Sequence, residues 1–232
     1  MPTANISGWI RIGLLALPVY GLLTFWATLE SQPDQTKNPE AWARFVSSTA
    51  HLLTHLFGSI GGTILAILGV FALGAYLARS RAGGMGLAAM VMAVVGHALF
   101  LSVVGLSAFA TPAIARAYLA GMQNVMRVHF GSAETATFGL GILLLLVGNV
   151  LLGVAVWRSG TLPKWAGAIW AASALMFYVL GAVLAMATTG SSLLTQPLAA
   201  VLMVVSGGWI AWSVLRQPSA EAVRVADQPR VR

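Results

Sequence analysis

Charged residues divide the chain into five long uncharged stretches, and these stretches predict the architecture. They run over residues 12–29, 45–78, 82–115, 135–157 and 165–215. A charge at the centre of a bilayer costs several kcal/mol, and about 20 apolar residues in a helix cross its core. The last stretch is long enough for two crossings, with a break at residues 188–192. The pattern therefore predicts six transmembrane helices, over about 10–29, 51–78, 84–109, 135–157, 165–187 and 197–215.

The basic residues predict an orientation with both termini in the cytoplasm. Nine of the 13 Lys and Arg then face inward, as the positive-inside rule expects. They are Arg11, Arg79, Arg81, Arg158, Lys164, Arg216, Arg224, Arg230 and Arg232. The outer bases are balanced by Glu30, Asp34, Glu40 and Glu134, so the whole net charge of +7 lies inside. This asymmetry explains the charge without nucleic acid and predicts contact with anionic lipid at the cytoplasmic face.

Composition agrees with an all-α polytopic bundle. The chain is 58% hydrophobic and 8% charged, whereas soluble domains carry about 25% charged residues. The absence of cysteine excludes disulfides, thiolate metal sites and iron–sulfur clusters. We expect one transmembrane domain over residues 1–216, followed by a polar cytoplasmic tail over 217–232. The first span is interpreted as a retained helix, although a cleaved signal peptide is the alternative.

Two proline-containing signals predict short interfacial helices on the outer side. Asn38-Pro39-Glu40 combines an N-cap, a first-turn proline and an acid that favours a helix N-terminus. Thr111-Pro112 opens a segment whose apolar residues recur every four positions up to Phe130. That segment is either a helix on the membrane surface or an extension of the third span. Gln196-Pro197 similarly predicts the start of the sixth span.

Histidine spacing indicates which helix faces look into the bundle. His51 and His55 continue in steps of three and four through Gly58, Gly62, Ala66 and Gly69, and small residues at this spacing mark close helix contacts in lipid. His97 shares a face with Gly86, Ala89 and Ala93 by the same rule. Counted from a turn at Arg81, His55 and His97 are offset by ten residues, or roughly 15 Å along antiparallel helices. One haem bridging both is therefore disfavoured.

The histidines define two candidate sites. The outer one comprises His51, His55, His129 and Glu134, a set that suits zinc or copper; the alternative is interfacial histidines bonded to loop backbone. The deeper one comprises His97, Asn149, Thr63 and Tyr178. It is either a set of interhelical hydrogen bonds or a pocket for a ligand, a proton or a haem. The spans lack Asp and Glu, which disfavours the carboxylate relays of proton pumps.

The cytoplasmic loop from Arg158 to Gly167, with its Gly160, Pro163 and Trp165, resembles a loop found in uncharacterised bacterial multi-helix membrane proteins that are grouped as domains of unknown function. The resemblance covers about ten residues. It implies a helical bundle in a bacterial cytoplasmic membrane and no particular activity.

The sequence thus favours a binding or accessory protein with a histidine-lined outer-leaflet site for a metal ion or a small apolar ligand. A small transporter of a neutral or apolar solute is the alternative, and a haem-binding or redox membrane protein is the second. No serine-hydrolase elbow or phosphate-binding loop is present, which leans against an enzyme. The sequence leaves open a homo-oligomer or a partner membrane subunit.

Overall fold

The computed structural model describes residues 6–30, 32–127, 131–184 and 194–217, and these residues form helices and connecting turns without any strand. In this part of the chain six helices are long and apolar enough to cross a membrane: Gly8–Thr28, Thr49–Leu77, Gly83–Leu119, Gly131–Arg158, Lys164–Leu184 and Thr195–Leu215. The all-α, six-helix prediction is therefore confirmed, and the architecture is that of a multi-pass membrane protein. The predicted break at 188–192 and the tail from 218 lie outside the described residues.

Several spans are built from more than one helical segment. The first joins α1 (Ile6–Leu14) to α2 (Ala16–Thr28). The second runs through α4 (Thr49–Leu53), the π-helix η1 (Thr54–Gly61) and α5 (Gly62–Leu77), and the fifth joins α8 (Lys164–Ala174) to the π-helix η3 (Leu175–Leu184). The remaining spans are single helices, namely α6 (Gly83–Leu119), α7 (Gly131–Arg158) and α10 (Thr195–Leu215). Two spans therefore change helical pitch partway across.

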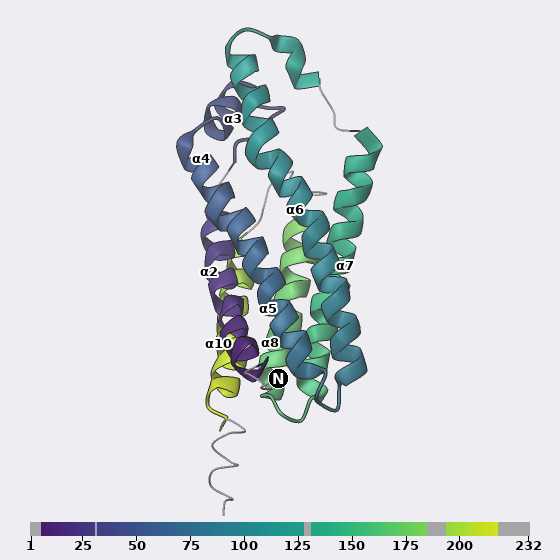
Figure 1. Cartoon of the computed structure of the whole chain (residues 1–232). Coiled ribbons are helices and arrows are strands. Elements are labelled where there is room, and N and C mark those ends of the chain that lie inside the picture. The colour runs from purple at the N-terminus through teal and green to yellow at the C-terminus, as the bar shows by residue number, and fades with distance from the viewer. Residues whose placement is uncertain (1–5, 31, 128–130, 185–193, 218–232) are drawn as a thin grey trace, which may run out of the picture.

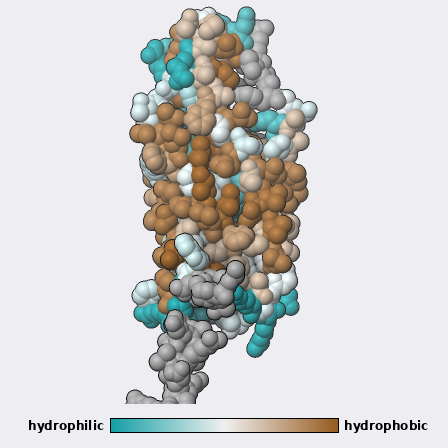
Figure 2. Space-filling view, in the orientation of Figure 1, coloured by the Kyte–Doolittle hydropathy of each residue, from teal (hydrophilic) through white to brown (hydrophobic). Residues whose placement is uncertain are grey.

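The six spans run alongside one another (Figure 1), and their contacts close them into a ring in chain order. α2 packs on α5, α5 on α6, α6 on α7 and α7 on α8, while α10 lies against both α8 and α2. The surface of this ring is a broad apolar belt with hydrophilic residues at both ends (Figure 2). Exposed apolar side chains within the spans, such as Phe71 and Phe109, suit such a belt, since lipid tails solvate them as well as a protein interior does.

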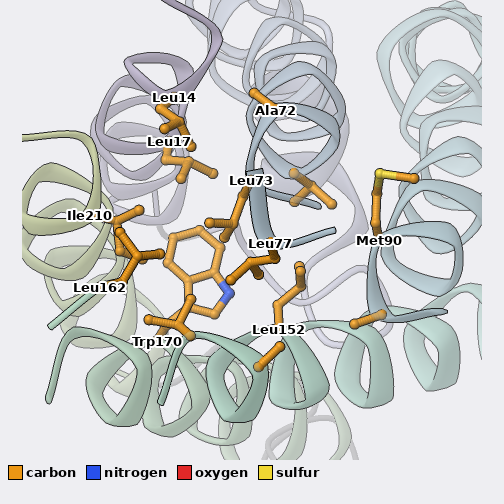
Figure 3. Packing of buried hydrophobic residues seen from close by; sticks show 14 of the residues in the cluster. Leu14, Leu17, Ala72, Leu73, Leu77, Met90, Leu152, Leu162, Trp170 and Ile210 are labelled. Atoms are coloured by element: carbon orange, nitrogen blue, oxygen red, sulfur yellow. The ribbon is translucent and has the colours of Figure 1, made fainter. Parts of the chain in front are cut away.

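Along its length, the bundle is filled solidly in the half that contains the start of α1. Trp170 of α8 lies at its centre among Leu73 and Leu77 of α5, Leu152 of α7 and Ile210 of α10 (Figure 3). All five side chains are at most 1% exposed. A cavity can therefore lie only in the other half of the bundle's length.

Glycines allow the helices to approach closely. A Cβ on Gly153 of α7 would collide with the backbone of Gly167 in α8, and a Cβ on Gly167 would collide with Gly153. Gly148 of α7 lies equally close to the backbone of Ala93 in α6. These contacts fix the positions of α6, α7 and α8, because van der Waals packing of small residues drives helix association in lipid.

A small cap covers the end of the bundle opposite the packed half. The helix α3 (Pro39–Val46) is capped by the Asn38 side chain, which accepts a hydrogen bond from the Ala41 N–H at 3.2 Å. Its Trp42 packs near Ala115, because α6 continues through Pro112 to Leu119. Of the two readings of the Thr111-Pro112 segment, the structure shows the extension of the third span up to residue 119. The short 3₁₀ helix η2 (Gln123–Arg127) follows.

The chain between α2 and α3 is stabilised by the Asp34 carboxylate. It accepts hydrogen bonds from the Thr36 hydroxyl at 2.6 Å and from the Thr36 and Lys37 backbone N–H groups. These hydrogen bonds, led by that of the Thr36 side chain, hold the pKa of Asp34 well below its usual range. The turn at Asp34 is therefore stable except at strongly acidic pH. A carboxylate whose pKa is depressed in the folded state stabilises the fold until the pH falls through that pKa.

Candidate functional site

A cavity of about 300 Å³ lies between the spans, in the half of the bundle's length that the Trp170 core does not fill. Each of the six spans contributes to its wall. The apolar lining includes Ala27, Phe100, Phe138, Ile142, Phe177 and Ala182. The polar lining comprises Tyr20, Thr24, Thr28, Ser59, Thr63, His97, Tyr178 and Gln196. The cavity is thus mostly apolar with a few polar groups, which is the usual character of a small-molecule site.

His97 is the polar group that the protein leaves unsatisfied in this wall. Its side chain is 2% exposed, and its Nδ1 atom lies 2.7 Å from the Ala93 carbonyl oxygen. A carbonyl can only accept, so Nδ1 carries the proton and Nε2 of the neutral ring is an acceptor. Nε2 has no hydrogen-bond partner in the described structure. A buried acceptor without a partner costs about 1–3 kcal/mol, so this atom requires an explanation.

Two tyrosines lie beside this histidine. The Tyr20 ring meets the His97 ring edge-on, with centroids 5.9 Å apart. The Tyr20 hydroxyl interacts with the hydroxyls of Tyr178 and Thr24. The described structure gives no such partner to His97 Nε2.

Both π-helical segments contribute to the cavity wall. η1 supplies Gly58 and Ser59, and η3 supplies Phe177, Tyr178, Gly181 and Ala182. A π-helix accommodates an extra residue per turn, and such segments occur frequently at functional sites. The change of pitch in the second and fifth spans is therefore confined to the level of the cavity.

The outer histidines form a pair with Glu30. The ring centroids of His51 and His55 are 4.1 Å apart, and Glu30 Oε2 lies 3.9 Å from His51 Nδ1. Glu30 Oε1 accepts a hydrogen bond from the Thr54 hydroxyl at 2.7 Å. Both ring nitrogens of His51 lack a hydrogen-bond partner, although the residue is 2% exposed. His55 Nε2 lies 3.1 Å from the Ser107 hydroxyl.

Glu134, another predicted member of the outer site, is not grouped with this pair. Glu134 lines a separate outer pocket of about 530 Å³ that also includes Trp42 and Ser107, and His129 lies outside the described residues. Among the residues that the structure describes, no three His, Asp or Glu side chains are grouped closely enough to hold a metal ion. The zinc or copper interpretation stays a prediction, which elemental analysis of protein purified without a histidine tag would test.

The deeper site contains three of its four predicted residues. His97, Thr63 and Tyr178 line the cavity, whereas Asn149 lies in the packed core and accepts a hydrogen bond from the Trp170 indole N–H at 3.1 Å. Tyr20 and Gln196, which also line the cavity, were not predicted members of the deeper site, and Glu30 was not a predicted member of the outer site. The position of Glu30, at the end of an uncharged stretch, was the signal that could have linked it to His51.

Comparison of the chain with protein-family models, with curated proteins and with solved structures finds no match.

Proposed function

We propose that the protein is an intramembrane binding protein for a small, mostly apolar molecule that carries one hydrogen-bond donor, such as a hydroxyl group. His97 lines the cavity, and its buried Nε2 atom has no hydrogen-bond partner in the described structure; this observation supports the proposal most directly. A ligand O–H bonded to this nitrogen would remove the penalty of a buried, unsatisfied acceptor. The deep histidine site takes the place of the outer pair as the proposed ligand pocket.

The size of the cavity sets the size of the ligand. An engineered protein cavity of about 150 Å³ binds benzene, and this cavity is about 300 Å³. It therefore suits a molecule of about two fused rings or a comparable branched chain. Phe100 and Phe138, whose ring centroids are 6.3 Å apart, provide aromatic surface for such a molecule.

The setting belongs to the same proposal. We assign the protein to a bacterial cytoplasmic membrane, with both termini on the cytoplasmic side. The cavity then lies in the outer half of the bilayer, on the side of the cap. An apolar ligand would reach it from the lipid or through the pocket that contains Glu134.

Binding of 1-naphthol and of 1-methoxynaphthalene tests the proposal. The two probes have similar apolar surface, and only 1-naphthol can donate a hydrogen bond. We expect 1-naphthol to bind the protein in detergent about tenfold more tightly, because one hydrogen bond that satisfies a buried group contributes about 1–2 kcal/mol. Thermal unfolding at increasing probe concentration would measure this preference, since a ligand that binds the folded state raises the melting temperature of the protein.

The variant His97→Leu should bind both probes equally, because it removes the acceptor and keeps an apolar wall. Ser206→Ala is the matched control, since Ser206 is fully buried in α10 and does not line the cavity. That variant should keep the preference for 1-naphthol. Equal binding of the two probes to the unsubstituted protein would contradict the proposal.

A further inference from the structure

The carboxamide of Gln196 is a second polar group on the wall of the cavity. The half-buried Gln196 side chain lies against Gly181 of η3, because a Cβ built on Gly181 would overlap Gln196 Cγ and lie 3.4 Å from the carboxamide carbon. Both residues line the cavity. Within the described part of the chain the carboxamide makes no hydrogen bond. A molecule in the cavity can therefore provide its partner.

His97 and Gln196 belong to opposite walls of the cavity. In the ring of spans, α6 neighbours α5 and α7, whereas α10 neighbours α8 and α2. His97 in the third span and Gln196 in the sixth are thus separated by two spans in either direction around the ring. Tyr20 lies beside His97, with ring centroids 5.9 Å apart. Its hydroxyl interacts with that of Tyr178, which precedes Gly181 by three residues in η3. A molecule that extends across the cavity would therefore meet His97 at one end and Gln196 at the other.

The two side chains require different partners. Nε2 of the neutral His97 ring accepts a hydrogen bond, so its partner is a donor. The Gln196 carboxamide has an NH₂ group with two donors and an oxygen that accepts. Buried N–H groups without a partner are rarer in proteins than carbonyl groups without one, so the NH₂ group determines which ligand group fits. An oxygen that only accepts, such as a ketone carbonyl, is its complement.

We propose that the ligand of the cavity is a two-ring molecule with a hydroxyl group at one end and a carbonyl oxygen at the other. The hydroxyl donates to His97 Nε2, and the carbonyl oxygen accepts from the Gln196 NH₂ group. The apolar body lies between them, beside Phe100 and Phe138. This inference rests on the proposed function, and it adds the second polar group of the ligand and the residue that selects it.

Two probes that differ only in the carbonyl test this inference. They are 5-hydroxy-1-tetralone and 5,6,7,8-tetrahydro-1-naphthol, which share the two rings and the hydroxyl group. Their binding is measured by thermal unfolding of the full chain in detergent and compared between variants. Gln196→Met removes the carboxamide and keeps the length of the side chain. Gln123→Met is the matched control, since Gln123 is exposed in η2 and does not line the cavity. Melting temperatures without probe show that both variants are folded.

We expect the preference for 5-hydroxy-1-tetralone over 5,6,7,8-tetrahydro-1-naphthol to fall about fivefold in Gln196→Met, because the carbonyl loses its hydrogen bond. Gln123→Met should keep the preference, and 5,6,7,8-tetrahydro-1-naphthol should bind Gln196→Met and the unsubstituted protein about equally. The infrared carbonyl band of bound 5-hydroxy-1-tetralone gives a second reading in the unsubstituted protein. It should lie at lower frequency than in a dry hydrocarbon, because the carbonyl accepts a hydrogen bond.

An unchanged preference in Gln196→Met, or an unshifted carbonyl band, would overturn the role of Gln196. The proposed function would still stand, because the hydroxyl preference at His97 is measured separately with 1-naphthol. Failure of both probes to bind the unsubstituted protein would overturn the proposed function and this inference together.

Discussion

Asn149 and Trp170 show how single polar residues specify the packed half of the bundle. The Asn149 side chain accepts from the Trp170 indole at 3.1 Å and donates to the Leu145 carbonyl at 2.9 Å. Both residues are at most 5% exposed. Asn149 is therefore satisfied on both sides and fixes the rotation of α8 against α7, whereas His97, whose buried Nε2 has no partner in the described structure, lines the cavity.

We predict that Trp170→Phe destabilises the protein by about 2–4 kcal/mol, from the lost ring volume and the unsatisfied Asn149 carbonyl. Unfolding in mixed micelles with increasing dodecyl sulfate measures the change. The matched control is Trp209→Phe, since Trp209 is 41% exposed in α10. This variant should unfold almost like the unsubstituted protein. Adding Asn149→Leu to Trp170→Phe should cost less than the sum of the two single changes, because both remove the same hydrogen bond. Equal unfolding of Trp170→Phe and Trp209→Phe would show that the bond contributes little.

At the scale of whole helices, sequence counting predicts relative position well. Counting from a turn at Arg81 places residue 107 opposite His55, and the structure confirms this register with the contact between His55 Nε2 and Ser107. The predicted inward face of the second span is largely confirmed, because His51, Gly58, Gly62, Ala66 and Gly69 are buried, while His55 is half-buried. Charge and small-residue spacing carry this information, since both follow directly from the cost of placing side chains in lipid.

Other features of the elements were not predictable from these patterns. A π-helix has no apolar signature of its own, so η1 and η3 are invisible in uncharged stretches. Depth along the membrane placed Asn149 beside His97, but which neighbour a side chain meets depends on helix rotation. Likewise, α10 begins at Thr195 rather than after Gln196, so the Gln196 side chain lies inside the first turn and faces the cavity.

The contact between α7 and α8 depends on Gly153 and Gly167, and this dependence gives a prediction at the helix scale. Gly153→Ala should destabilise the bundle by about 1–3 kcal/mol, because the added methyl would meet the α8 backbone and force the helices apart. Gly139→Ala in the same helix should be neutral or stabilising by up to about 1 kcal/mol, since a Cβ there meets nothing within 4 Å and alanine favours a helix. Dodecyl sulfate unfolding distinguishes them, and similar curves would mean that α7 and α8 are not in close contact.

For the molecule as a whole, the six spans form a closed ring that is packed along one half of its length and encloses a cavity along the other half. This feature relates the fold to the proposed function. The closure of the ring, with α10 against α2, brings Tyr20 and Gln196 to the same cavity although they lie at opposite ends of the chain. Sequence patterns identified the six members of the ring. They did not identify its order of contacts, which is set by the close packing at the small residues.

The orientation of the ring in the membrane gives the last prediction. The chain contains no cysteine, so single cysteines report their location without background. We expect Asn124→Cys in the cap to react with a membrane-impermeant maleimide in intact cells. Gly84 is exposed at the end of the bundle that carries Arg79, Arg81 and Arg158. Gly84→Cys should react only after the membrane is permeabilised, because the positive-inside rule predicts that this end is cytoplasmic. The opposite pattern would invert the orientation.

The same assay separates a binding protein from a transporter through Ser59, which lines the cavity. In a binding protein, the Trp170 core fills the half of the bundle that the charge pattern predicts to be cytoplasmic. Ser59→Cys should then react only with reagent that is supplied from the side of the cap. Alternating access, which rocks one part of a transporter against another, exposes a central site to each side in turn. Labelling of Ser59→Cys from the cytoplasmic side would therefore require the packed half of the ring to open, and it would favour transport over binding.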